Sequence, residues 1–177
     1  MTVPAATHAD LRIGESFIGE GAEAAHINTV LGHRAGPAGV AWATALATPR
    51  TGHVPFVAVL RPGLPAKPMT LFVNKAAVET PEHADLTWGA AQAGVAAGVM
   101  DAVADGTVPE DAVDDLVLIA AVWVNPAAAD ADLVYANNRE ATRSALRAGA
   151  AGTPSVADAL DARHAPANPF YIPPGDA

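Results

Sequence analysis

A predicted strand near the N-terminus carries a histidine and an asparagine on the same face. His26 and Asn28 share this face because side chains in a strand alternate with a period of two. The segment just before the strand, GEGAEA, is rich in glycine and leaves space for a ligand. An imidazole is the side chain best suited to exchange a proton near neutral pH, so His26 is a candidate general acid. The residues alone leave open a purely structural role for this histidine.

Lysine is rare in this chain and confined to one short segment. Lys67 and Lys75 are the two lysines, and arginine carries the other positive charges. The pKa of an ammonium group responds to burial, whereas a guanidinium stays charged. Lys75 lies in an apolar, alternating stretch, residues 71–78, that predicts a strand. Lys75 is therefore a candidate site residue, and the alternative is a lysine that faces solvent.

Other familiar site patterns are not supported. The GEGAEA segment matches the letters of a dinucleotide-binding turn, but a predicted strand follows it, so no helix N-terminus meets a phosphate. We therefore interpret it as a hairpin turn. The six histidines lack metal-ligand spacing, and the acidic residues between 101 and 115 lack calcium-loop spacing, so no metal site is expected.

The elements that position these residues predict an α+β fold. Strands are expected at 11–18, 24–31, 54–60, 71–78 and 116–124, and helices at 36–48, 81–105 and 126–149. This order suggests a two-layer domain in which helices cover one face of a mixed β-sheet. Gly94 and Gly98 should let the second helix pack closely on the sheet. We expect a flexible N-terminal arm at 1–10, one domain at 11–150 and a proline-rich C-terminal tail at 151–177.

Composition excludes several classes of function. The net charge of −9 offers no basic stripe for nucleic acid and does not favour anionic membranes. The chain has no cysteine, which excludes disulfides and thiolate chemistry. The N-terminus lacks the pattern of a secretory signal, and the longest apolar run, residues 116–124, is too short to span a bilayer. We therefore expect a cytoplasmic protein with no nucleic-acid or membrane partner.

Three segments resemble the formaldehyde-activating enzyme family: GESFIGEGAEAAHIN, RPGLPAKPMTLFVNK and the stretch from WGAAQAG to AAVWV. The resemblance covers residues 11–149. It implies condensation of formaldehyde with tetrahydromethanopterin to give methylene-tetrahydromethanopterin and water. It also implies an α+β fold like domain 2 of ribosomal protein S5, a homopentamer, and a pterin-binding cleft between subunits. The pterin would be a co-substrate, with no permanently bound cofactor.

The resemblance assigns roles to four residues of this chain. His26 matches the histidine that acts as the acid, while Lys75 and Gln92 match positions that contact the pterin. Val57 occupies an apolar contact position where the family has leucine. Lys75 would either bind the pterin electrostatically or form a transient Schiff base with formaldehyde, and we favour electrostatic binding.

Two substrate-contacting positions depart from the family pattern. Asn28 replaces an aspartate and Ala77 replaces a threonine, so one charge and one hydroxyl are lost. We expect His26 to be less easily protonated than in relatives with aspartate at position 28. The sequence therefore predicts a divergent hydro-lyase. The alternatives are a homologue that acts on another amine carrier and a non-catalytic binder of pterin or formaldehyde.

Overall fold

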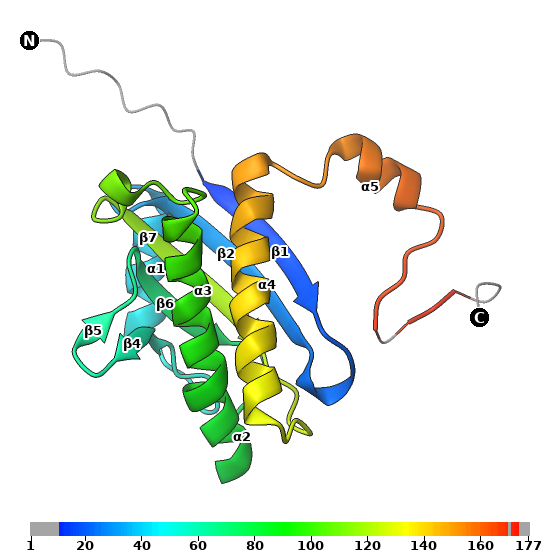
Figure 1. Ribbon diagram of the computed structural model, residues 1–177, viewed down its shortest axis with the longest axis horizontal. Coiled ribbons are helices and arrows are strands. Elements are labelled where there is room, and N and C mark those ends of the chain that lie inside the picture. The colour runs from blue at the N-terminus through cyan, green and yellow to red at the C-terminus, as the bar shows by residue number, and fades with distance from the viewer. Residues whose placement is uncertain (1–10, 170, 174–177) are drawn as a thin grey trace, which may run out of the picture.

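A five-stranded mixed sheet forms the centre of the protein (Figure 1). The computed structural model describes residues 11–169 and 171–173, so the arm expected at 1–10 lies outside the described residues. The strand order is β1-β2-β7-β6-β3, antiparallel except for the parallel pair β6–β7. The strands are β1 (Arg12–Ile18), β2 (Ala25–His33), β7 (Leu116–Trp123), β6 (Met69–Asn74) and β3 (Phe56–Val57).

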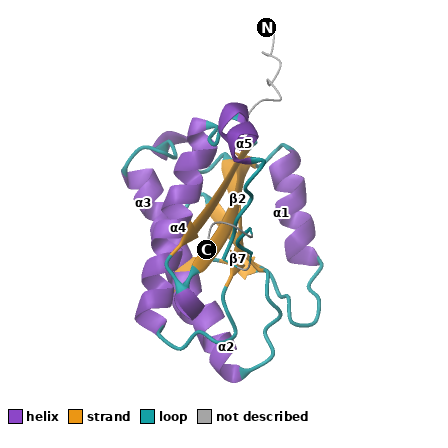
Figure 2. Ribbon diagram, turned by 90° about the vertical axis from the view of Figure 1, so that its right-hand side faces the viewer, coloured by secondary structure: helices purple, strands orange, loops and turns teal. Residues whose placement is uncertain are grey.

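Two long helices cover one face of this sheet, as expected. Helices α3 (Gln92–Ala104) and α4 (Ala131–Ala151) pack side by side there, while α1 (Pro37–Ala47) lies on the opposite face against β2 and β7 (Figure 2). The α+β class with a mixed sheet is thus confirmed, with α1 as an addition to the second face. The indole Nε1 of Trp42 in α1 donates to the carbonyl of Met69 at 3.1 Å and ties the helix to β6.

The core between the sheet and the helices α3 and α4 follows from the alternation of the strands. Ile27 of β2, Phe72 of β6 and Val122 of β7 point to this side and pack with Val95 of α3 and Val134 of α4. All five are almost fully buried. The alternate residues of β2, among them those predicted for the site, must therefore face the other side of the sheet.

Glycines let α4 approach its neighbours closely. A Cβ at Gly94 or Gly98 of α3 would lie 2.4 Å from a backbone oxygen of α4, that of Tyr135 or Arg139. A Cβ at Gly14 of β1 would lie 1.8 Å from the carbonyl oxygen of Ala145. The sequence predicted that Gly94 and Gly98 contact the sheet. Instead they contact α4, because helices pair along their small residues.

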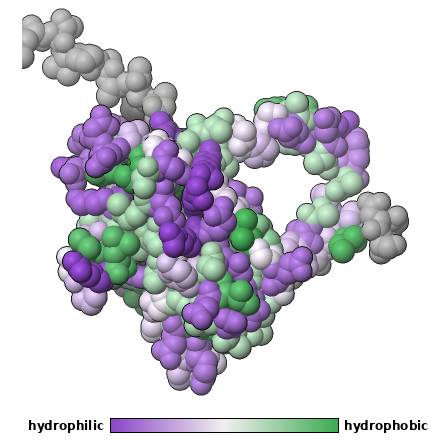
Figure 3. Space-filling model, in the orientation of Figure 1, coloured by the Kyte–Doolittle hydropathy of each residue, from purple (hydrophilic) through white to green (hydrophobic). Residues whose placement is uncertain are grey.

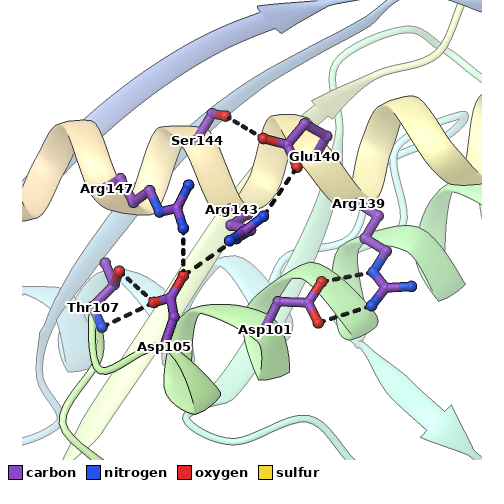
Figure 4. Close-up of polar contacts among 8 residues, drawn as sticks. All are labelled: Asp101, Asp105, Thr107, Arg139, Glu140, Arg143, Ser144 and Arg147. Carbon is purple, nitrogen blue, oxygen red and sulfur yellow. Dashed lines mark hydrogen bonds and ion pairs between the residues drawn. The ribbon is translucent and has the colours of Figure 1, made fainter.

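Ion pairs join α3 to α4 along their outer side (Figure 4). Arg139 binds Asp101 through two hydrogen bonds of 2.6 and 2.9 Å. One turn further along, Asp105 accepts from Arg143 at 3.2 Å and Arg147 at 2.7 Å. Hydrophilic side chains dominate this part of the surface (Figure 3). The two helices are therefore held by close packing within and by paired charges outside.

Several elements differ in detail from the prediction. The helix expected at 81–105 comprises α2 (Pro81–Asp85), a π-helical segment at Leu86–Ala91 and then α3. The strand expected at 54–60 is divided into β3 and β4 (Val59–Arg61), and β4 forms a hairpin with β5 (Leu64–Pro65). Short 3-10 turns occur at Gly21–Glu23 and Glu110–Ala112. The first of these connects β1 to β2, which confirms the GEGAEA hairpin turn.

A short helix lies within the segment assigned to the proline-rich tail. Helix α5 (Val156–Ala162) begins with a capping box in which Ser155 and Asp158 bond each other's backbone N–H. Its residues are exposed, and it stands away from the body of the domain (Figure 1). Val156 and Leu160 lie one turn apart on it and are both more than half exposed.

Candidate active site

The register of the strands brings two of the predicted site residues, His26 and Asn28, to the α1 face of the sheet. Asn28 of β2 lies opposite Glu15 of β1 and Ala121 of β7, and His26 lies opposite Phe17 and Trp123. Directly opposed residues in a ladder point to the same face. Two neighbouring rows of side chains therefore cross this face.

His26 occupies an open position on this face. Its Nε2 lies 2.9 Å from Oε1 of Glu15 on the neighbouring strand. The ring of Phe17 lies beside it, with centroids 5.8 Å apart and the planes tilted by 46°. The side chain of His26 is 37% exposed, so a solute can reach the imidazole. A positioned, accessible imidazole with a carboxylate partner can carry out acid–base chemistry.

Lys75 joins the same group from just beyond β6, which ends at Asn74 and not at residue 78 as expected. Its Nζ donates to Oδ1 of Asn28 at 2.8 Å. Burial lowers the pKa of Lys75, and the carboxylate of Glu15 opposes this effect. The amide of Asn28 thus holds the ammonium of Lys75 without neutralising it. Three of the predicted site residues, His26, Asn28 and Lys75, therefore lie in one group.

A network of backbone contacts fixes the chain around Lys75. The side-chain nitrogen of Asn74 donates to the carbonyls of Gly52 and Ala76, both at 2.7 Å. The carbonyl of Asn74 lies 3.0 Å from Nδ1 of His53. Ala77 follows directly and packs against Gly52, where an added Cβ would lie 3.1 Å from its own. Ala77 thus lies two residues from Lys75, in a loop braced by the 50–53 turn.

The remaining two predicted residues lie elsewhere, in an apolar pocket. Val57 and Gln92 line a cavity of about 440 Å³ with Trp88, beside the edge strand β3 and the π-helical segment. The amide of Gln92 is already engaged, since it accepts from the backbone N–H of Val59 at 2.8 Å and donates to its carbonyl at 3.1 Å. The side chain of Trp88 stays half exposed in this pocket. Such a pocket suits a flat, largely apolar ring.

The two groups of residues are separated within one subunit. Two strands, β7 and β6, lie between β2, which carries His26, and β3, which carries Val57. Three inter-strand spacings amount to roughly 14 Å. The six predicted site residues therefore divide into a polar group of His26, Asn28, Lys75 and the adjacent Ala77, and a pocket group of Val57 and Gln92.

Other features of the described residues point to no second centre. A groove of about 540 Å³ lies along α3 and α4, but it is lined by the charges that already pair with one another there. Within residues 11–169 and 171–173, no three His, Asp or Glu side chains gather as they would around a metal ion. The described helices include none with the length and apolar character needed to cross a membrane.

Sequence reasoning missed two residues that the structure brings to these groups. Glu15 of β1 contacts His26 of the adjacent strand β2, and only the β1–β2 register reveals this pairing. The short turn between the two strands was the available signal, because it fixes the register of a hairpin. Helical periodicity gives no sign of Trp88. The helix has π geometry at this residue, and its side chain lines the pocket with Val57 and Gln92.

Comparison with known proteins identifies the family of this chain. Residues 13–171 match the family model described as formaldehyde-activating enzyme (Fae). The chain is 44% identical over 158 residues to the 5,6,7,8-tetrahydromethanopterin hydro-lyase of Methanosarcina barkeri, covering 89% of both chains. It is 39% identical over 150 residues to the bifunctional enzyme Fae/Hps of Methanosarcina mazei and 40% over 161 residues to that of Archaeoglobus fulgidus.

The extent of these matches differs. Against the two bifunctional enzymes the match covers 85% and 91% of this chain but 38% and 41% of theirs. Against the hydro-lyase it covers nearly the whole of both chains. A family model spanning most of the chain and a relative this similar over 89% of both chains lead to one conclusion: the chain belongs to the formaldehyde-activating enzyme family.

Proposed function

We propose that the protein condenses formaldehyde with tetrahydromethanopterin, giving methylene-tetrahydromethanopterin and water. Membership of the family and the similarity to a tetrahydromethanopterin hydro-lyase support this activity. The observation that carries the assignment to a site is the position of His26, which is accessible on the sheet face beside Lys75 and Asn28. The proposal includes a cytoplasmic location. It includes no permanently bound cofactor, since the steps are amine additions, proton transfers and the loss of water.

The proposed role of His26 is that of a general acid. A secondary amine of the pterin adds to formaldehyde and forms a carbinolamine. Protonated His26 gives its proton to the carbinolamine hydroxyl. The C–O bond then breaks, water departs, and an iminium ion is formed. The second pterin amine then adds to the iminium carbon, and its surplus proton returns to the neutral imidazole. A general acid of this kind contributes about 10²–10⁴ in rate.

Lys75 and the pocket group supply binding in this proposal. The ammonium of Lys75 attracts a carbonyl oxygen of the pterin and is held by Asn28 in the correct position. The pterin ring stacks on Trp88 beside Val57. Gln92 contributes by fixing the backbone of Val59, which forms one wall of the pocket. Ala77 leaves the loop after Lys75 free of a bulky polar group.

We further propose that the two groups meet across a subunit interface. Within one chain they are about three strand spacings apart, roughly 14 Å. A ring of identical subunits, here a homopentamer, places one surface of each chain against a different surface of the next. His26, Asn28 and Lys75 of one subunit would then face the pocket of Val57, Trp88 and Gln92 on its neighbour.

Substitution of the proposed acid tests the function. His26→Ala should lower the condensation rate about 10²–10⁴-fold, once the spontaneous reaction has been subtracted. The matched control is His33→Ala, because His33 is an exposed histidine at the far end of the same strand. A rate in His26→Ala equal to that of the unmodified protein would dismiss the proposed role.

Asn28 favours one alternative function. Its neutral amide contacts Lys75 at a position where the family pattern has the carboxylate of an aspartate. Ala77 likewise lacks the hydroxyl of the threonine in that pattern. These two differences would suit a different amine carrier. Condensation rates with tetrahydromethanopterin and tetrahydrofolate separate the candidates, and faster turnover of the folate would select the alternative. Binding of either pterin without any rate enhancement would instead indicate a non-catalytic binder.

A further inference from the structure

The contact between Glu15 and His26 is a diagonal contact across strands β1 and β2. Glu15 lies directly opposite Asn28, and its carboxylate leans along the strand toward His26, two residues away on the same face. Oε1 of Glu15 lies 2.9 Å from Nε2 of His26. Diagonal neighbours in a ladder are within reach of long side chains, so this contact follows from the register. Among the described residues, none bonds Nδ1 of the same ring.

The charges that surround His26 identify Glu15 as its carboxylate partner. From β1 the facing group is Glu15, and from the end of β6 it is Lys75, which binds Asn28. Strand β7 contributes Trp123 to the same row, and α1 on this face carries no charged side chain. The nearby carboxylate of Glu23 is turned away, toward the N–H of Ala129 at 3.3 Å.

We propose that Glu15 is a positioning residue for His26 in the reaction assigned above, on which this inference rests. Its carboxylate accepts the Nε2–H of His26 and holds the ring, so that Nδ1 delivers the proton to the carbinolamine hydroxyl. The same negative charge offsets the imidazolium, a task for which the neutral amide of Asn28 is unsuited. Glu15 on β1 thus supplies the carboxylate that strand β2, which carries His26, lacks.

The direction of proton transfer agrees with this assignment. When the imidazolium loses its Nδ1 proton to the departing hydroxyl, the neutral ring keeps its proton on Nε2. In that form the proton is on the nitrogen that lies 2.9 Å from Oε1 of Glu15. The surplus proton from the second pterin amine then returns to Nδ1, and the ring is charged again. Without Glu15, the neutral ring is free to carry its proton on either nitrogen.

Two substitutions separate the hydrogen bond from the charge. Glu15→Ala removes both and should lower kcat about 10- to 100-fold while leaving KM for the pterin within about twofold. Glu15→Gln keeps an oxygen that accepts from Nε2 but removes the charge, so its loss of kcat should be smaller. Glu20→Gln, in the adjacent exposed turn, is the matched control and should leave kcat unchanged. An unchanged kcat in Glu15→Ala would overturn the proposal.

A carboxylate returned to the cluster should rescue the charge. In the double variant Glu15→Gln, Asn28→Asp, the amide of Asn28 is replaced by a carboxylate of the same shape. This carboxylate lies two residues from His26 on the same face. It should recover a substantial part of kcat, whereas Asn28→Asp in the Glu15→Ala background should recover less because the ring stays unanchored. If the double variants show the same kcat as their parents, the charge is not what Glu15 supplies and the proposal fails.

A spectroscopic measurement tests the hydrogen bond without any activity. Nitrogen NMR of the neutral His26 ring should show the proton on Nε2 in the unmodified protein and in Glu15→Gln, but a mixture in Glu15→Ala. A mixture in all three would overturn the positioning role. Should His26→Ala keep its full rate, the proposed function fails. Should it lose its rate while Glu15→Ala keeps both kcat and the Nε2 form, only the role of Glu15 fails.

Discussion

The ammonium group of Lys75 reaches across strand β7 to lie 2.8 Å from Oδ1 of Asn28 on β2. The β7 residue opposite Asn28 is Ala121, whose methyl group leaves room for this contact. Burial disfavours the charged ammonium and lowers the pKa of Lys75, and the carboxylate of Glu15 offsets this effect only in part. A partly satisfied cation beside an accessible imidazole is suited to bind an electron-rich substrate oxygen.

Removal of this cation should weaken substrate binding more than it slows the chemistry. Lys75→Met keeps the length of the side chain and removes the charge. KM for the pterin should rise about tenfold or more, the cost of a hydrogen bond from a charged donor, while kcat changes less. Lys67→Met, on the exposed side chain that pairs with Asp114, is the control.

Borohydride separates electrostatic binding by Lys75 from a Schiff base. Reduction in the presence of formaldehyde, followed by mass mapping, should leave Lys75 no more labelled than Lys67. Selective labelling of Lys75 would favour the covalent role.

Mixed assemblies test whether one site draws on two subunits. His26→Ala and Trp88→Glu should each be inactive alone, since one loses the acid and the other puts a charge in the apolar pocket. When equal amounts are co-assembled, about a quarter of the interfaces pair two intact halves. About a quarter of the activity should therefore return.

The control for this experiment is a mixture of His26→Ala and His26→Gln, which shares the same defective half and should stay inactive. Activity of the first mixture no greater than the sum of its components would place the whole site within a single subunit.

Trp88 should contribute a stacking surface for the pterin. Trp88→Ala is expected to weaken pterin binding by about 1–3 kcal/mol, the range for a base on an aromatic ring, whereas Trp88→Phe should lose less. Calorimetry measures the affinity, and quenching of Trp88 fluorescence by the pterin reports the contact. Equal affinity in Trp88→Ala and the unmodified protein would show that the ring lies elsewhere.

The ion pairs between α3 and α4 should make stability depend on acid pH. Hydrogen bonds from Thr107 and the nearby arginines lower the pKa of Asp105, and Arg139 lowers that of Asp101. Because these pKa values are lower in the folded protein, the unfolded chain takes up protons first as the pH falls through about 4. The stabilisation is therefore present at neutral pH and lost on acidification.

Asp105→Asn should lower Tm at neutral pH by about 2 °C or more and flatten the fall of Tm between about pH 5 and 3. In about 1 M salt the arginine contributions are screened and those of Thr107 persist. The unmodified protein should therefore keep part of its pH dependence there. An identical pH dependence in the variant and the unmodified protein would contradict this account.

Close packing of α3 on α4 predicts a sharp contrast between two glycines. Gly98→Ala places a Cβ 2.4 Å from the carbonyl of Arg139 and should cost about 1–3 kcal/mol in the free energy of unfolding. Gly89, in the π-helical segment, has open space around its Cβ position. Gly89→Ala should be neutral or stabilising by about 0.5–1 kcal/mol. Chemical denaturation measures both, and similar losses in the two variants would contradict the packing argument.

Periodicity predicted most of the fold because strands such as β2 alternate between a buried face and a more open one. The alternation around His26 and Asn28 gave both the strand and the shared face, and the wholly apolar run from Leu116 gave the central strand. Periodicity did not predict the β4–β5 hairpin or the π-helical segment at Leu86–Ala91. Strands of two or three residues carry no period, and a single wider turn changes no residue type.

The candidate site was predictable where it lies along one strand and not where it depends on pairing. Family resemblance supplied Gln92 and Val57, but their separation from His26 follows only from the strand order. Glu15 required the β1–β2 register. The expectation that His26 is less easily protonated than in relatives with aspartate at position 28 stays a prediction. What the sequence did not indicate is that Glu15 approaches His26 from the neighbouring strand.

Strand β7 sits in the middle of the sheet yet comes last of the described strands along the chain. During synthesis, β2 and β6 each lack their partner β7 until residues 116–123 have been made. A nascent chain therefore has two strands with an unpaired edge. Such edges expose unpaired backbone N–H and C=O groups, with which a strand of another polypeptide can pair. Translation that stops before Leu116 therefore releases fragments prone to aggregate, and a ribosome that pauses there prolongs the hazard.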